Sequence, residues 1–393
     1  MQTSDVVILS GARTPMGAFQ GELSALAAPQ LGAAAIAAAV GSSGVTAADV
    51  NETLMGCVLP AGLGQAPARQ ASRFGGLPDG VPCTTINKVC GSGMKAVMIA
   101  ADQIALGRAG IVVAGGMESM TNSPYLLPKA RGGYRLGHGE IKDHMFLDGL
   151  EDAYEHRLMG TYAEDAARHY QFTREAQDAY ATESLKRAKA AQASGAFKDE
   201  IVAIKLASKS GDVEIAADEQ PRKADPAKIP TLKPAFAKDG TVTAANSSSI
   251  SDGAAALVLT SSDIAQQRGL KPIARIVAQA SHAGEPRWFT TAPVGAIGKA
   301  LKLADWTKDD VDLFEINEAF ANVAMIAMRD LDLDHAKVNV NGGACALGHP
   351  IGASGARILV TLLNALKNRG GKRGVASLCI GGGEATAVAV EML

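Results

Sequence analysis

The feature of this sequence that most restricts its fold is a strand-and-turn pattern that occurs twice. Residues 112–118, an apolar run that enters a Gly-Gly-Met-Glu turn, have a counterpart in residues 377–384, where an apolar run enters Gly-Gly-Gly-Glu. The glycine-rich turn at residues 87–93 has a counterpart in residues 341–355, and each is followed by an Ala- or Leu-rich helical stretch and then an apolar strand. Such a repeat predicts two similar halves packed face to face. Because glycine and alanine inflate accidental matches, chance similarity is the alternative interpretation.

The rest of the chain also alternates strands with helices, which predicts parallel βαβ units in an α/β fold. From about residue 121 to residue 244, prolines, glycines and charges replace this alternation, apart from one amphipathic helix at residues 173–194. We interpret that stretch as an insertion. The predicted domains are an N-terminal half at residues 1–120 plus 245–272, an inserted loop domain at 121–244 and a C-terminal half at 273–393.

Composition excludes several classes of function. The chain has 393 residues, 47% of them hydrophobic, and a net charge of −2, so no broad electrostatic field attracts nucleic acid. No apolar run reaches the roughly 20 residues that span a bilayer, and the first residues lack the pattern of a signal peptide. The five cysteines have no CxxC spacing, which argues against a disulfide framework and against a zinc site. We therefore expect a cytoplasmic protein without metal, nucleic-acid or membrane partners.

Cys90 is the first candidate for chemistry. It lies where a short extended run, residues 81–87, turns into a helix, among glycines that allow a tight turn. A thiol at a helix N-terminus has its thiolate form favoured by the helix dipole, and the thiolate is the nucleophile. Most free cysteines are buried and inert, however, so the position alone leaves both interpretations open.

Three further residues lie in similar glycine-rich surroundings. His349, in residues 346–352, is of the type that serves as general base for a thiol, although a lone loop histidine is more often a bystander. Cys379 precedes three glycines whose N–H groups can bind an anion, or is simply a buried strand cysteine. Asn317 follows an apolar strand and opens a helical stretch, where most asparagines are N-caps.

Together, the segments around Cys90, Asn317, His349 and Cys379 resemble the four signature blocks of the thiolases, of the acetyl-CoA acetyltransferase type. The resemblance covers essentially the whole chain, in order and at the family's spacing, and residues 13–17 and 118–120 fit as well. It implies a five-layered α/β/α/β/α fold made of two similar halves, with a loop domain inserted in the first.

The resemblance also implies a reaction, the reversible Claisen condensation of two acetyl-CoA molecules to acetoacetyl-CoA and CoA through an acyl-Cys90 intermediate. His349 accepts the proton of Cys90, and Cys379 acts as acid or base at the α-carbon of the second thioester. One oxyanion site is formed by the N–H groups of Cys90 and Gly381, and the other by His349 and a water held by Asn317. Coenzyme A thioesters are substrates, and no cofactor stays bound.

Family contacts to coenzyme A carry over to Leu150, Met159, Arg222, Phe236, Ala244, Ser248, Ala319 and Phe320. Two positions of the acyl region depart from the acetoacetyl-type pattern. Leu158 stands where that pattern has a histidine, for which His156 is a possible substitute, and Phe289 replaces a methionine that limits acyl length. Chain-length specificity is therefore open, and a degradative 3-ketoacyl-CoA thiolase of broader chain length is the alternative.

Two more distant interpretations also remain. A decarboxylating ketosynthase shares the fold, but the block at Cys379 argues against it. A non-catalytic acyl-CoA-binding relative would not need all four candidate residues intact. Residues 131–150 resemble the loop through which tetrameric thiolases associate, and we therefore expect a homotetramer, a dimer of dimers.

Overall fold

The computed structural model describes residues 5–207 and 211–393. Its main sheet has ten strands, in the order β12-β13-β14-β11-β1-β10-β5-β3-β4, with β2 paired to β10. The N-terminal half contains β1 (Val6–Arg13), β2 (Gly17–Ala18), β3 (Glu52–Gly56), β4 (Cys83–Ile86), β5 (Ile111–Ser119), β10 (Ser251–Ser261), α1 (Ala28–Ser42), α2 (Pro67–Phe74), α3 (Ser92–Ala105) and α7 (Ser262–Gln267). The C-terminal half contains β11 (Ala274–Ala283), β12 (Leu313–Ile316), β13 (Arg373–Ile380), β14 (Glu384–Met392), α8 (Ala292–Ala304), α9 (Ala321–Asp330), α10 (Ala344–Leu347) and α11 (Ser354–Arg369).

The strand pairing repeats between the two halves, as the sequence predicts. Strand β5 runs parallel to β3 and antiparallel to β10, which in turn pairs with β1. Strand β13 runs parallel to β12 and antiparallel to β14, which in turn pairs with β11. The halves join through two residue pairs, Val7 with Arg275 and Ile8 with Ala274. The glycine-rich turns therefore match because they occupy equivalent places in a duplicated unit.

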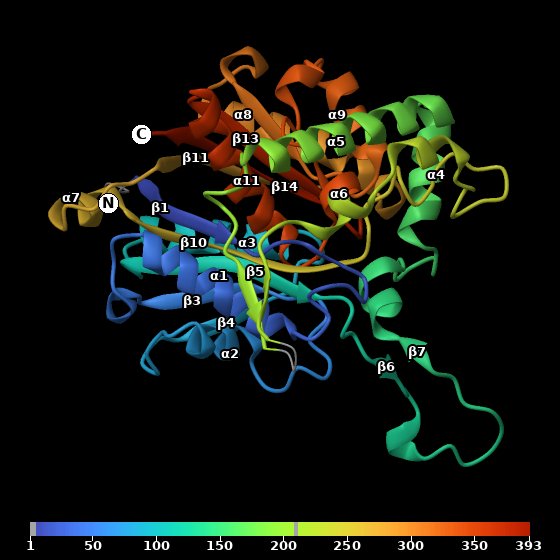
Figure 1. The fold of residues 1–393 in the computed structure, drawn as a ribbon, viewed down its shortest axis with the longest axis horizontal. Helices are drawn as coiled ribbons and strands as arrows, with labels where there is room; N and C mark the ends of the chain where they lie inside the picture. The colour runs from blue at the N-terminus through green and yellow to red at the C-terminus, as the bar shows by residue number, and fades with distance from the viewer. Residues whose placement is uncertain (1–4, 208–210) are drawn as a thin grey trace.

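Helices cover both faces of each half-sheet (Figure 1). Helices α3 and α11 pack between the two halves in one central core, α1 and α2 cover the outer face of the N-terminal half, and α8 and α9 cover the outer face of the C-terminal half. The predicted five-layered α/β/α/β/α fold is confirmed. Because α3 and α11 lie side by side in the middle layer, the turns that precede them open at the same end of the core.

Two predicted helices differ from the observed ones at their first turns. The Ala-rich apolar pattern of residues 23–40 predicts a helix that Pro29 splits, whereas the observed helix begins only at Ala28, with Pro29 in its first turn. Proline is tolerated there because the first N–H groups of a helix have no intrahelical partner. The Ala-rich apolar spacing of residues 96–106 predicts a buried helix there, and helix α3 in fact begins earlier, at Ser92, directly after the Cys90 turn. The capped helix is confirmed as α5 (Arg174–Ser194), with Thr173 accepting from the Ala176 N–H and Gly195 left-handed.

The segment between β5 and β10 forms the rest of the molecule. It contains β6 (Tyr125–Leu126), β7 (Lys142–Asp143), a π-helix (Phe146–Leu150), α4 (Met159–His169), α5, β8 (Ile204–Leu206), β9 (Val213–Ile215) and α6 (Glu219–Lys223). The buried Arg13 ties it to β1 through ion pairs of 2.5 Å to Glu200 and 2.7 Å to Asp218. The division into domains at residues 120, 244 and 272 stays a prediction. Within the described residues, no helix combines the length and apolar character needed to cross a bilayer.

Candidate active site

Cys90 lies in a strained turn between β4 and α3. Val89 has a φ of +45°, a left-handed conformation that is costly for a β-branched residue. Side chains on both sides hold it there: the Asn87 Oδ1 accepts from the Val89 N–H at 2.9 Å, and the Ser92 hydroxyl donates to the Val89 carbonyl at 2.6 Å. Lys88 forms an ion pair with Glu384 of the other half. The turn therefore has one conformation, which fixes the direction of the thiol.

The surroundings of Cys90 keep its side chain protonated and prepare it for attack. Burial raises the pKa of the Cys90 thiol to about 11, although the backbone N–H groups of Gly381 and of Cys90 itself approach the sulfur and lower it. Near neutral pH the residue is therefore a thiol that needs a base to become a nucleophile. The same two N–H groups lie close to the sulfur, where they can donate to the oxygen of an acyl carbon bonded to it, which carries negative charge in the transition state.

His349 is suited to be that base. Its Nδ1 lies 2.6 Å from the Ser354 Oγ, whose single hydrogen is donated to the Pro350 carbonyl at 3.0 Å. With the Ser354 hydrogen directed to Pro350, the ring proton of His349 is assigned to Nδ1, which donates it to Ser354. Burial, followed by the positive charge of Arg357, lowers the pKa of His349 to about 3, so the ring is neutral and its Nε2 is free to accept a proton.

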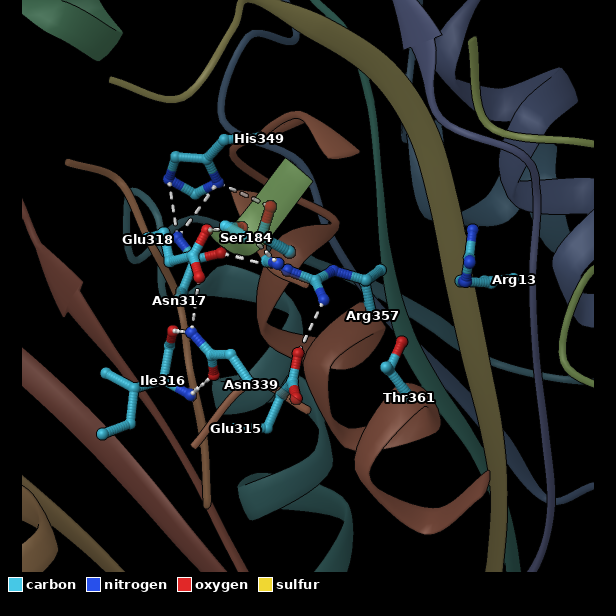
Figure 2. Close-up of polar contacts among 12 residues, drawn as sticks. Arg13, Ser184, Glu315, Ile316, Asn317, Glu318, Asn339, His349, Arg357 and Thr361 are labelled. Carbon is cyan, nitrogen blue, oxygen red and sulfur yellow. Dashed lines mark hydrogen bonds and ion pairs between the residues drawn. The ribbon is translucent and has the colours of Figure 1, made fainter. Parts of the chain in front are cut away.

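Asn317 lies beside the imidazole of His349 (Figure 2). Its Nδ2 is 3.4 Å from each ring nitrogen, and its Oδ1 accepts from Arg357 Nη2 at 3.3 Å. The alternative role as an N-cap does not hold, because α9 begins at Ala321 with Phe320 as its N-cap. Asn317 instead directly follows the strand β12, with its N–H donated to the Ser377 carbonyl on β13.

Cys379 is completely buried near the end of β13. Burial raises the pKa of its thiol well above the ordinary value, and the neighbouring Cys90 raises it further. A thiol with a high pKa is a weak acid whose anion is a strong base, which suits removal of a proton from carbon. Gly382 and Gly383, which follow it, have φ of +88° and +86°, conformations that side-chain-bearing residues rarely adopt.

A cavity of about 350 Å³ opens over these residues, and its lining is mostly apolar. Cys90, His349 and Gly381 lie in its wall together with nine predicted substrate contacts: Leu150, Leu158, Met159, Phe236, Ala244, Ser248, Phe289, Ala319 and Phe320. An apolar chamber with a thiol, an imidazole and convergent N–H groups fits an uncharged acyl group in a reaction with a nucleophilic sulfur.

Known proteins share this arrangement over the whole chain. Residues 6–263 match the thiolase N-terminal domain, and residues 270–392 match the thiolase C-terminal domain. The chain belongs to the thiolase family. It is 53% identical to acetyl-CoA acetyltransferase 2 of Arabidopsis thaliana, over 99% of this chain and 97% of that one. It is 52% identical to the acetyl-CoA acetyltransferase of Cupriavidus necator, over 99% of both chains.

Two solved structures have the same fold. The acetyl-CoA acetyltransferase of Bacillus anthracis superposes with a TM-score of 0.97 at 44% identity, covering 100% of both chains. The Acat5 thiolase of Ascaris suum, solved in complex with coenzyme A, has a TM-score of 0.94 at 44% identity, covering 99% of this chain and 100% of that one. The prediction of a thiolase made from the four sequence blocks is confirmed.

Some predicted residues of this thiolase lie away from the cavity wall. Asn317 and Cys379 are buried behind it. Arg222, on α6, pairs with Glu22 at 2.5 Å and is not among the lining residues. His156 is mostly exposed beside Glu151, with its Nδ1 3.2 Å from the Glu151 carboxylate, and is not in the wall either. The roles of all these residues stay predictions.

Ser354 and Arg357 support the site from the start of α11, and the sequence pattern did not predict this role for either residue. One signal was available for Arg357. A cation near the start of an apolar helix opposes the helix dipole, so it needs a partner in the core. Among the residues that the structure describes, no group of three or more His, Cys, Asp or Glu side chains is arranged to hold a metal ion.

Proposed function

We propose that this thiolase is an acetyl-CoA acetyltransferase, which condenses two acetyl-CoA molecules to acetoacetyl-CoA and CoA and also catalyses the reverse thiolysis. The observation that carries the proposal is that Cys90, His349 and Gly381 line the same apolar cavity, with the Gly381 N–H close to the Cys90 sulfur. Whole-chain relatives at about half identity that bear the name acetyl-CoA acetyltransferase support it. Soluble CoA thioesters serve as substrates, and no cofactor stays bound.

In the first half-reaction, Cys90 Sγ attacks the carbonyl of acetyl-CoA while His349 Nε2 takes the thiol proton. The negative charge of the tetrahedral intermediate falls on the oxygen that faces the N–H groups of Cys90 and Gly381. The carbon–sulfur bond to CoA then breaks, and the departing thiolate takes the proton of the Cys379 thiol, while His349 keeps on Nε2 the proton that it took from Cys90. The products are acetyl-Cys90 and free CoA.

In the second half-reaction, Cys379, which became a thiolate when it gave its proton to the departing CoA, removes a proton from the α-carbon of a second acetyl-CoA. The enolate oxygen is stabilised by His349 and by a water held on the Asn317 amide, and the carbanion attacks the carbonyl of acetyl-Cys90. The carbon–sulfur bond to Cys90 breaks, which releases acetoacetyl-CoA, and the Cys90 thiolate takes its proton back from His349. In thiolysis, Cys379 returns the proton to the carbanion of the departing acetyl-CoA.

We propose that coenzyme A reaches the cavity along the inserted loop domain, residues 121–244. Leu150, Met159 and Phe236 of that domain line the cavity, as do Ala244 and Ser248 at its end. The Ascaris suum neighbour solved with coenzyme A supports such a site. Arg222 reaches the nucleotide only after leaving its ion pair with Glu22.

The acyl end of the cavity favours short chains. Phe289 is 2% exposed and meets the ring of Phe320 edge-on, with the ring centroids 6.2 Å apart, and Phe236 also meets Phe320 edge-on, at 6.0 Å. Three packed rings leave little room beyond a four-carbon 3-ketoacyl group. Leu158 adds apolar surface to the cavity lining, which favours longer acyl chains. This observation supports the alternative, a degradative thiolase of broader chain length.

We further propose that the protein is a homotetramer in the cytoplasm. The β6–β7 hairpin projects from the body of the molecule (Figure 1). It carries exposed apolar side chains, among them Leu136 at 97% and Ile141 at 67% exposed, which an interface between copies of the chain would cover. The five free cysteines suit a reducing compartment.

The test is a thiolysis assay with acetoacetyl-CoA and CoA, alongside 3-ketoacyl-CoA substrates of increasing length. Cleavage confined to the four-carbon substrate supports the acetyl-CoA acetyltransferase. Equal or faster cleavage of longer chains supports the broad thiolase. Absence of cleavage for every substrate contradicts the proposed function.

A further inference from the structure

We propose that Arg357 is a positioning residue for the carbon–carbon bond step, because it fixes the direction of the Asn317 amide. The inference rests on the proposed function, since it assigns a task within that reaction. Arg357 does not line the cavity and touches no reacting atom. It acts through Asn317, whose amide lies against the His349 ring.

The contacts of Arg357 are few and specific (Figure 2). The side chain is completely buried, with Nη1 3.1 Å from Glu315 Oε1 and Nη2 3.3 Å from Asn317 Oδ1. Its Nε has no hydrogen-bond partner among the described residues. The two terminal nitrogens of the guanidinium thus contact two residues of a single segment, Glu315 in β12 and Asn317 directly after it.

The sequence spacing places these two partners on one face. Glu315 and Asn317 are two residues apart, and Glu315 lies in β12 with Asn317 directly after it. Side chains at i and i+2 of an extended strand point to the same side, here toward α11. Arg357 lies in the second turn of α11, eight residues after His349. Helix α11 therefore begins with Ser354, which contacts the base His349, and also carries Arg357, which contacts Asn317 beside that base.

The chemistry of the pair determines the orientation of the amide. Arginine has only N–H donors, so the Asn317 atom that it contacts must be the oxygen. The NH₂ group is then forced toward His349, where it can donate to a water or to an enolate oxygen. Without Arg357, the amide is free to turn by half a revolution and present its oxygen to that site, which repels negative charge.

Stability alone does not explain this buried ion pair. Removal of two charges from water is expensive, and replacement of such a pair by apolar residues is often neutral or stabilising. Burial raises the pKa of Glu315 above its ordinary value, and the charge of Arg357 opposes that rise, so Glu315 is readily protonated when the arginine is absent. An Arg357→Met variant therefore has a neutral partner available, and Glu315→Gln with Arg357→Met removes both charges outright.

The experiment compares two reactions of the full-length enzyme at one pH. Exchange of labelled CoA into acetyl-CoA requires only the first half-reaction, whereas thiolysis of acetoacetyl-CoA also requires the Asn317 amide. We expect Arg357→Met, alone and with Glu315→Gln, to lower kcat of thiolysis on the order of 100-fold while KM and the exchange rate change less than about threefold. Arg357→Lys, which can still donate to the amide oxygen, recovers about tenfold of the loss. The control is Arg369→Met at the exposed end of the same helix, which leaves both rates unchanged.

Each variant is first checked for folding by its thermal unfolding midpoint. The inference is overturned if a folded variant without Arg357 keeps wild-type kcat of thiolysis, or if exchange and thiolysis fall by the same factor. If the wild-type enzyme exchanges CoA but does not cleave acetoacetyl-CoA, the proposed function is wrong. The wild-type result thus tests the proposed function, and the variant result tests the positioning role of Arg357.

Discussion

Phe289→Ala should lengthen the acyl chain that the enzyme accepts. Phe289 lies in the short helical turn Pro286–Thr291 before α8, is 2% exposed and forms the cavity wall against Phe320. Removal of the ring opens space at the acyl end of the cavity. A six-carbon 3-ketoacyl group has two methylenes more than acetoacetyl, and burial of each contributes about 0.8 kcal/mol. The expected gain of about 1.6 kcal/mol corresponds to a roughly 15-fold rise in relative specificity.

The assay is the ratio of kcat/KM for the six-carbon substrate to that for acetoacetyl-CoA, in the variant and in the wild type. Loss of the buried ring also costs about 3–5 kcal/mol of stability, so the unfolding midpoint is measured first and Phe289→Leu serves as a milder variant. Phe74→Ala is the matched control, because Phe74 is 64% exposed and far from the cavity wall. A folded variant whose ratio equals that of the wild type refutes the assignment of Phe289 as the wall.

Three further predictions concern the catalytic amide, the base and the assembly. Asn317→Ala should lower kcat of thiolysis by about 100- to 1,000-fold with CoA exchange retained, as stopped-time assays of both reactions would reveal. Because the pKa of His349 is about 3 in the folded protein against an ordinary 6.5, the unfolded chain binds the extra proton and stability falls as pH drops below 6.5. Between about pH 7 and about pH 5, urea unfolding of His349→Gln should lose about 2 kcal/mol less than the wild type; equal losses contradict the assigned pKa. Leu136→Asp with Ile141→Asp should convert tetramers to dimers in light scattering, and an unchanged mass would refute the hairpin interface.

The repeat was readable from the sequence because each half places a candidate catalytic residue in the same kind of turn. Cys90 and His349 both precede helices of the central layer, and both sit among glycines needed for tight backbone approach. The short apolar strands were also recognisable, since they are buried on both faces and read as continuous apolar runs. The start of α1 was misplaced because the apolar pattern continues through residues 23–27, where the backbone instead forms turns before Pro29.

The contacts that hold the candidate site residues in place could not be predicted from local sequence patterns. Arg357 lies 40 residues from Asn317 in the chain, and only the packing of α11 against β12 brings them together. The tautomer of His349 depends on a hydroxyl five residues away and on that hydroxyl's own acceptor. The ion pair between Arg222 and Glu22 is equally invisible in the local sequence, because it links positions 200 residues apart. Contacts of this kind follow from the tertiary fold and have no signature in the nearby sequence.

The central claim is that Cys90 carries the acyl group. The most direct measurement is peptide mass spectrometry of the enzyme after incubation with acetyl-CoA and an acid quench. The account predicts one acetyl group on the peptide that contains Cys90, removed by excess CoA and absent from Cys90→Ala. Acetylation of a different residue, or a Cys90→Ala variant that still cleaves acetoacetyl-CoA, would contradict it.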